Sequence, residues 1–129
     1  MDILLDTYAL IWFINGDASL PDKAITLIKD IKTNCFVSIA SIWEIAIKLS
    51  LGKLELNGEL KDISRIMEQY QIELLPIVFE HIQELLTLEY QHRDPFDRII
   101  ISQAFVENLI IITKDENFKK YNVSVVWDK

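Results

Sequence analysis

The sequence is poor in the residues that hold small proteins together by cross-links or metal clusters. It contains one cysteine, Cys35, and two histidines, His81 and His92, in 129 residues. A single cysteine cannot form an internal disulfide, and these three side chains are too few for the four ligands of a structural zinc site. We therefore expect an apolar core to supply the stability of the fold.

Glycine, proline and long apolar runs are also scarce. There are three glycines and three prolines, and half of the residues are apolar, a composition typical of globular chains. The longest apolar run, ALIWFI at 9–14, is far shorter than the ~20 residues that cross a bilayer. The first residues carry Asp2 and Asp6 and lack a basic segment, so no secretory signal is expected. We expect one soluble, cytoplasmic domain over residues 1–129.

Positive charge is in deficit. The chain has 13 lysines and arginines against 20 aspartates and glutamates, which gives a net charge of −7. This balance argues against a broad electrostatic surface for nucleic acid, which requires a basic face. It favours cations or basic partners.

Short buried runs alternate along the chain with segments whose apolar residues recur at helical spacing. The predicted strands are 3–6, 35–38, 72–77, 109–113 and 123–127. The predicted helices are 7–15, 21–32, 39–54, 58–70, 78–88 and 95–108, with a helical turn at 116–121. Such alternation predicts an α/β fold of three layers, α/β/α, around a central parallel sheet of four to five strands.

Two acids follow predicted strands. Asp6 closes the first strand, and Asp115 comes just after the strand at 109–113. Sites in parallel α/β sheets form beyond the carboxyl ends of the strands. Each aspartate could equally serve as the N-cap of the helix that follows it. Local sequence leaves both interpretations open.

Glu44 lies inside an apolar helical segment. It shares a narrow polar face with Ser41 and Lys48. The acid could form an exposed pair with Lys48, four residues on, or it could face a cleft. The local sequence slightly favours the exposed pair.

The segment RDPFDRIIISQA at 93–104 carries two aspartates. Asp94 followed by Pro95 predicts the start of a helix. Asp97 then falls in the first turn, where an acid interacts favourably with the helix dipole. From there its side chain also points toward the carboxyl ends of the strands. Four acids at one rim repel one another unless cations neutralise them, and hard divalent ions such as Mg²⁺ or Mn²⁺ take oxygen ligands.

Four segments together resemble PIN-domain ribonucleases, and specifically VapC-type toxins of toxin–antitoxin pairs. They are LLDTYALIWFINGD at 4–17, SIASIWEIAIKLSLGKL at 38–54, HRDPFDRIIISQA at 92–104 and IIITKDENFKKY at 110–121. The resemblance covers the chain nearly end to end and implies a PIN-like domain. It implies a catalytic and metal-binding set of four acids: Asp6, Glu44, Asp97 and Asp115. Thr7 and Thr113 match accompanying hydroxyl residues, whereas Tyr8 stands where relatives often have histidine.

The implied activity is endonucleolytic hydrolysis of RNA phosphodiester bonds with one or two Mg²⁺ or Mn²⁺ ions. Asp6, Asp97 and Asp115 are the expected ligands. Glu44 is expected either to bind a second ion or to orient the attacking water. In such sites the metal lowers the pKa of the water and stabilises charge on the leaving oxygen.

The expected contacts with the RNA substrate are the two threonines and the cations of the same segments: Thr7, Thr113, Arg93, Arg98 and Lys114. Lys119 and Lys120 are expected to be ordinary solvated charges. The resemblance also implies a cognate antitoxin whose basic, arginine-bearing segment enters the cleft. Trp12 and Trp43 would permit a homodimer if exposed, although core packing is the use we expect for them.

Three other functions fit parts of the sequence. The chain could be a non-catalytic α/β binding module whose acids are caps and surface charges. It could be a PIN nuclease of RNA processing outside a toxin–antitoxin pair. A phosphoacceptor receiver domain is disfavoured because Thr7, not a second acid, follows Asp6.

Overall fold

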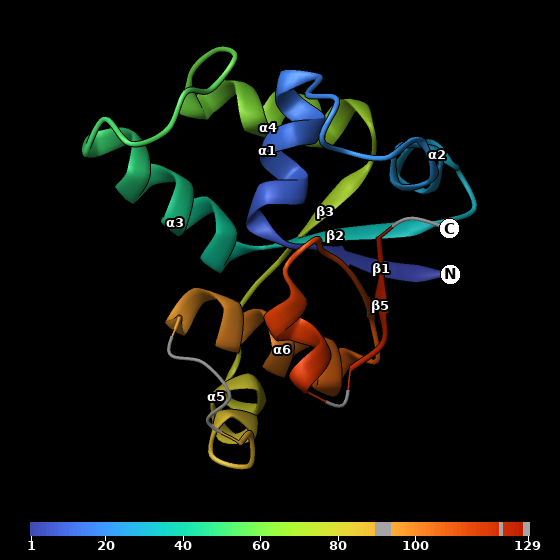
Figure 1. Cartoon of the computed structure of the whole chain (residues 1–129), viewed down its shortest axis with the longest axis vertical. Helices are drawn as coiled ribbons and strands as arrows, with labels where there is room; N and C mark the ends of the chain where they lie inside the picture. The colour runs from blue at the N-terminus through green and yellow to red at the C-terminus, as the bar shows by residue number, and fades with distance from the viewer. Residues whose placement is uncertain (90–93, 122, 128–129) are drawn as a thin grey trace.

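The computed structural model describes residues 1–89, 94–121 and 123–127. Five parallel strands form one sheet in the order β3-β2-β1-β4-β5 (Figure 1). The strands are β1 Asp2–Leu5, β2 Asn34–Ser38, β3 Ile72–Leu75, β4 Ile110–Ile112 and β5 Val125–Val126. The helices are α1 Thr7–Asn15, α2 Asp22–Lys29, α3 Ile39–Ser50, α4 Leu60–Gln69, α5 Phe79–Leu85 and α6 Pro95–Glu107, followed by the 3₁₀ helix η1 Glu116–Lys120.

The central strand β1 is apolar from Ile3 to Leu5 because both of its faces are covered there. Ile3 and Leu5 belong to one core cluster, and Leu4 belongs to the other. Side chains alternate between the two faces of a strand, so a strand buried on both sides has a continuous apolar sequence. The pattern ILL thus reflects burial in the middle of the sheet.

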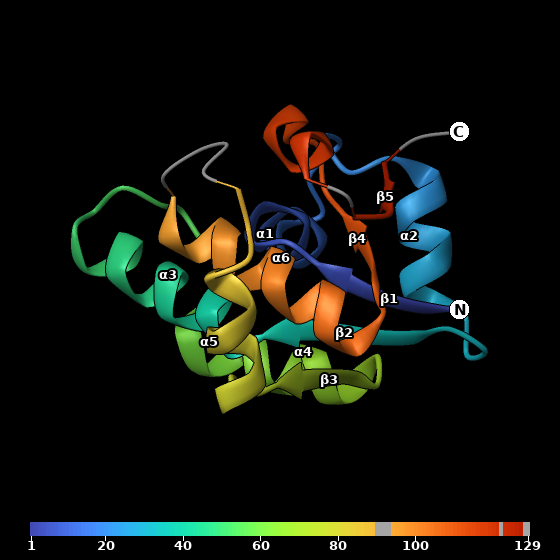
Figure 2. The same cartoon turned by 90° about the horizontal axis from the view of Figure 1, so that it is seen from below.

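Helices cover the sheet on both sides. Residues of α1, α2 and α4 pack with the first cluster, and residues of α6 and η1 pack with the second. Figures 1 and 2 show α1 and α4 on one side of the sheet and α5 and α6 on the other. The predicted three-layer α/β/α fold with a parallel sheet is confirmed, with five strands.

The strand register brings three chain segments to one rim of the sheet. Leu5 pairs with Val37 of β2 on one side and with Ile112 of β4 on the other. The residues that follow these partners, Asp6 and Thr113 among them, therefore leave the sheet at the same level. This rim is where sites form in parallel sheets.

The predicted helix 21–32 is too long. The helix α2 ends at Lys29, and Ile31, which the pattern assigned to its apolar face, is 88% exposed. Asp30 has extended backbone angles, and its side chain accepts a hydrogen bond from the backbone N–H of Lys32. Such a local side-chain bond competes with the helix and ends it.

The two tryptophans also differ from expectation. Trp12 is partly buried and packs against the first core cluster, as predicted. Trp43 is 62% exposed and contacts Phe96 edge to face, with ring centroids 5.2 Å apart. Core packing is therefore the wrong role for Trp43.

The strand order excludes one alternative. Receiver domains have the flavodoxin-like order 2-1-3-4-5, whereas this sheet has the order 3-2-1-4-5. The receiver interpretation is wrong. No helix within the described ranges combines the length and the apolar character of a membrane span.

The central sheet predicts where truncation is costly. Replacing Ile111, which is fully buried in β4, by alanine should lower the free energy of unfolding by about 2–5 kcal/mol through lost burial and a cavity. The same change at exposed Ile31 should cost less than about 0.5 kcal/mol. Urea denaturation of both variants measures the difference, and equal losses would contradict this placement of the core.

Candidate functional site

A cleft of about 590 Å³ opens at the carboxyl rim of the sheet. Its walls come from α1, α3, the start of α6 and the segment after β4. The lining residues are Asp6, Thr7, Tyr8, Trp12, Glu44, Lys48, Asp94, Asp97, Lys114 and Asp115. All four acids of the predicted catalytic set therefore line one cleft, although they come from four different parts of the chain.

Asp6 is both a helix cap and a buried member of this cleft. One carboxylate oxygen accepts the backbone N–H of Ala9 at 2.8 Å, and the other accepts the hydroxyl of Thr113 at 2.5 Å. Burial raises the pKa of Asp6 to about 6, although the bonds from Thr113 and Ala9 favour ionisation. The charges of Asp115 and Glu44 raise this pKa further. The sequence left two interpretations of Asp6 open, helix cap or site residue. In the structure Asp6 caps α1 and also lines the cleft.

Thr113 connects Asp6 to Asp115. Its hydroxyl donates to Asp6 and accepts the backbone N–H of Asp115 at 3.0 Å. Asp115 in turn caps η1 by accepting the N–H of Asn117 at 2.8 Å. One hydroxyl thus fixes the spacing of two acids from opposite ends of the sequence.

Asp94 and Asp97 divide the two roles predicted for them. Asp94 caps α6 by accepting the N–H groups of Phe96 at 2.9 Å and Asp97 at 3.1 Å. Asp97 is half-buried in the first turn of that helix. Burial, and then the charges of Asp94, Asp6 and the other two cleft acids, raise the pKa of Asp97 to about 8. In this arrangement the Asp97 carboxyl holds its proton at neutral pH.

Glu44 is buried and not solvated. Its Oε1 accepts the hydroxyl of Thr7 at 2.7 Å, and its Oε2 lies 3.1 Å from the Nζ of Lys48. The predicted pair with Lys48 exists, but at the wall of the cleft and not on an exposed face. The two interpretations of Glu44 are therefore combined, as they are for Asp6.

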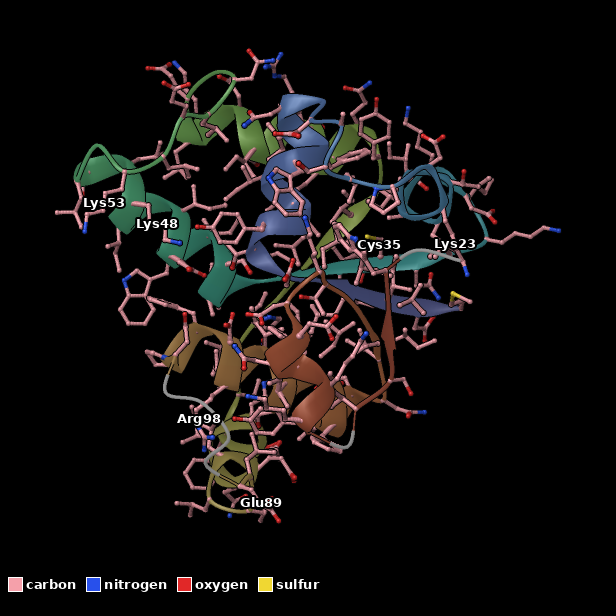
Figure 3. All side chains as sticks on the ribbon, in the orientation of Figure 1. Lys23, Cys35, Lys48, Lys53, Glu89 and Arg98 are labelled. Atoms are coloured by element: carbon pink, nitrogen blue, oxygen red, sulfur yellow. The ribbon has the colours of Figure 1, made fainter. Side chains whose placement is uncertain are left out.

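Lys48 is a cleft residue that the sequence named only as a partner of Glu44, and it contacts Tyr8, which stands where relatives often have histidine. The Nζ of Lys48 donates to the Tyr8 hydroxyl at 2.8 Å and lies 4.5 Å from the centre of the Tyr8 ring. Figure 3 shows Lys48 projecting from α3 toward α1. The spacing of Lys48 from Glu44 was the available signal, because residues four apart share a helix face.

The predicted cationic contacts are only partly placed at the cleft. Lys114 lines it, with Nζ 6.0 Å from the centre of the Trp12 ring. Arg98 does not line it, and that prediction needs correction. Arg98 is buried and donates to the carbonyl of Glu89 at 3.0 Å and to the hydroxyl of Tyr121 at 3.1 Å, on the α5 side of the fold (Figure 3).

Arg93 lies outside the described residues. Lys119 is solvated and pairs with Glu116 of its own helical turn, as expected of a surface charge. Thr7 lies at the cleft as predicted. Thr113 is buried beneath Asp6 and supports the acids.

The chemistry of the donor set fits a hard divalent cation. Carboxylate oxygens are the ligands that Mg²⁺ and Mn²⁺ prefer. The pKa values of Asp6 and Asp97 are raised, so the cleft disfavours their negative charge. A bound cation would stabilise the ionised carboxylates. Within the described ranges no three His, Cys, Asp or Glu side chains form a ready-made ion-binding group. The acids surround the cleft without converging on one point.

Comparisons with known proteins agree with this geometry. A family model of the PIN domain matches residues 3–123. The chain is similar to the structure of VapBC2 from Rickettsia felis bound to a DNA fragment from their promoter, at 18% identity, with 99% of this chain and 100% of that chain covered and a TM-score of 0.74. Among curated proteins no sequence matches this chain.

Two further structures have the same fold. VapBC-1 from nontypeable Haemophilus influenzae is 17% identical, with 98% of this chain and 97% of that chain covered and a TM-score of 0.66. A toxin–antitoxin complex from Klebsiella pneumoniae is 17% identical, with 96% and 95% covered and a TM-score of 0.64.

The raised pKa values predict how stability depends on pH. Carboxyls of the unfolded chain titrate near 4, whereas Asp6 and Asp97 titrate near about 6 and about 8 in the fold. Between roughly pH 4 and 8 the folded state binds more protons, so the free energy of unfolding of the metal-free protein should fall as pH rises. Urea denaturation in EDTA at pH 5 and pH 8 measures this.

Asp97→Asn should remove most of that pH dependence. Asp22→Asn is a matched control because Asp22 is also a first-turn acid, but it is exposed and lies outside the cleft. An Asp97→Asn protein with the same pH slope as the wild type would contradict the assignment.

Proposed function

Because the chain belongs to the PIN domain family, whose members are generally nucleases, we propose that it is a metal-dependent endoribonuclease that hydrolyses RNA phosphodiester bonds. One observation carries the proposal. Four acids from separate parts of the chain line one cleft, and burial there raises the pKa of Asp6 and of Asp97. Such a cluster needs a cation to stabilise its ionised form.

The residues divide into ligands and supports. Asp6, Asp97 and Asp115 would hold one or two Mg²⁺ or Mn²⁺ ions. A bound ion would supply positive charge to the phosphodiester and lower the pKa of a water molecule. Thr113 holds Asp6 and orients Asp115, so two of the ligands are positioned before any ion arrives.

Glu44 differs from the other acids because both of its oxygens contact protein donors. We propose that Glu44 orients the attacking water, or holds a second ion once Lys48 moves away from it. Lys48 supplies the positive charge that compensates Glu44 in the metal-free protein. Among the predicted substrate contacts, Lys114 is the described cation that lines the cleft, and it would contact a phosphate of the RNA.

We further propose that this nuclease is the toxin of a VapBC-type toxin–antitoxin pair. The similar structures from Rickettsia felis and Haemophilus influenzae are VapBC complexes, which supports an antitoxin partner here. The net charge of −7 and the carboxylates of the cleft suit a basic antitoxin segment. An arginine of that segment could occupy the carboxylates through charge-assisted hydrogen bonds.

Induced expression in a bacterial host tests the proposal. The wild type should arrest growth and produce new RNA ends, and the purified protein should cleave RNA with Mn²⁺ and lose that activity in EDTA. Asp97→Asn should lower the cleavage rate by about 100-fold or more, because loss of a ligand should cost at least as much as loss of a residue that merely supports one. Asp22→Asn, the exposed first-turn acid, should cleave at the wild-type rate.

Equal cleavage by the wild type and Asp97→Asn would point to a contaminating nuclease. A wild type that neither arrests growth nor alters RNA would favour the non-catalytic binding module. In that case Mn²⁺ should also leave the unfolding free energy unchanged, because an assembled ion site stabilises only the folded state. Cleavage without growth arrest would favour a PIN nuclease outside a toxin–antitoxin pair.

A further inference from the structure

One wall of the cleft is aromatic. Tyr8 and Trp12 lie one turn apart on α1, with ring centroids 5.8 Å apart and planes tilted by 42°. The Trp12 ring also contacts the Trp127 ring edge to face, with ring centroids 5.7 Å apart. Tyr8 is 42% exposed despite its contacts, so core packing does not account for its ring.

Two lysines accompany these rings. Lys48 lies over the Tyr8 ring and donates to its hydroxyl, and Lys114 lies over the Trp12 ring. All four side chains line the same cleft as the acids. The wall therefore combines aromatic surface with two lysines, Lys114 and the Glu44-paired Lys48, directly beside a cluster of carboxylates.

This combination is the one that binds single-stranded nucleic acid. Aromatic side chains stack on the π-face of a base, and lysines contact the phosphates on either side. The cleft volume of about 590 Å³ is within the range of roughly 300–1,000 Å³ that holds small organic ligands, so a nucleotide fits. We propose that Tyr8 and Trp12, flanked by Lys48 and Lys114, form a subsite that stacks an unpaired RNA base next to the acidic cluster.

The subsite deepens the proposed nuclease function and rests on it. It defines the substrate class as RNA with unpaired nucleotides, such as loops, bulges and tails. In a duplex the base faces are covered by neighbouring pairs and cannot stack on a protein ring. Base recognition would also be rigidly linked to the reacting phosphate, because Asp6 caps the same helix that carries Tyr8.

The charges favour RNA over a protein ligand at this wall. A basic antitoxin segment is attracted to the carboxylates, but Lys48 and Lys114 repel an arginine that approaches the rings. An RNA strand has the opposite preference, since its phosphates are attracted to the lysines and repelled by the acids. The two ligands would therefore use different parts of one cleft.

Binding of short RNAs to Tyr8→Leu tests the subsite. All proteins carry Asp97→Asn so that the RNA stays intact, and fluorescence anisotropy reports the Kd for a labelled single-stranded 12-mer and for its duplex. Loss of the ring should raise the Kd for the single strand by about tenfold, as stacking on an aromatic side chain contributes roughly 1–3 kcal/mol per base. The Kd for the duplex should change by less than about twofold.

Two matched variants isolate the ring. Tyr8→Phe keeps the ring but loses the hydroxyl that Lys48 contacts, so it should lose far less affinity than Tyr8→Leu. Phe79→Leu removes an aromatic ring that is 72% exposed on α5, outside the cleft, and should leave the Kd unchanged. A second 12-mer lacks the base that stacks on Tyr8. The parent protein, which keeps Tyr8, should bind this abasic 12-mer more weakly than the intact one. The Tyr8→Leu protein should bind the two 12-mers equally.

The outcomes separate the subsite from the nuclease. Equal single-strand affinities of Tyr8→Leu and its parent would overturn the subsite, and the nuclease would stand if the wild type still cleaves RNA with Mn²⁺. If Tyr8→Leu binds RNA as tightly as its parent but binds an arginine-rich peptide more weakly, the subsite proposal would be overturned in favour of a protein ligand. A parent protein that binds no RNA, together with a wild type that cleaves none, would overturn both proposals.

Discussion

The repulsion between carboxylates in a half-buried cleft is the constraint on which the rest of this site depends. Asp6 and Asp97 have lost solvent and gained like-charged neighbours, and both effects raise their pKa. The fold answers with local donors: Thr113 and a backbone N–H for Asp6, and Thr7 with Lys48 for Glu44. The pKa of Asp97 is raised further than that of Asp6, so Asp97 should respond more strongly to a bound cation.

The sheet makes this crowding possible because its strands end at one level. Leu5 pairs with residues of both neighbouring strands, so the segments that leave the sheet after them meet at one rim. Two of these exits begin helical segments whose N-caps are cleft acids, Asp6 and Asp115. Capping and clustering coincide at Asp6 and Asp115, because each side chain caps a helical segment and also lines the cleft.

Local rules predicted much of the fold, whereas the set of four acids came from the resemblance to a known family, since the local sequence favoured an exposed Glu44. Strand ends, N-caps and helical spacing depend on neighbouring residues, so Asp6, Asp94 and Asp115 could be placed without a structure. Arg98 could not be placed by its proximity to Asp97. Successive residues of an α-helix point about 100° apart, so the carboxyl that faces the cleft turns the next side chain toward α5. The exposure of Trp43 and the contact of Lys48 with Tyr8 depend on how whole helices pack, which spacing along one helix does not reveal.

The hydrogen bond between Thr113 and Asp6 joins residues that are 107 positions apart. On a ribosome Asp6 therefore emerges long before Thr113. Strand β4, which must pair with β1 to bring them together, is also made late. A nascent chain therefore lacks an assembled acidic cluster until β4 has emerged and paired with β1, however early Asp6 itself is made.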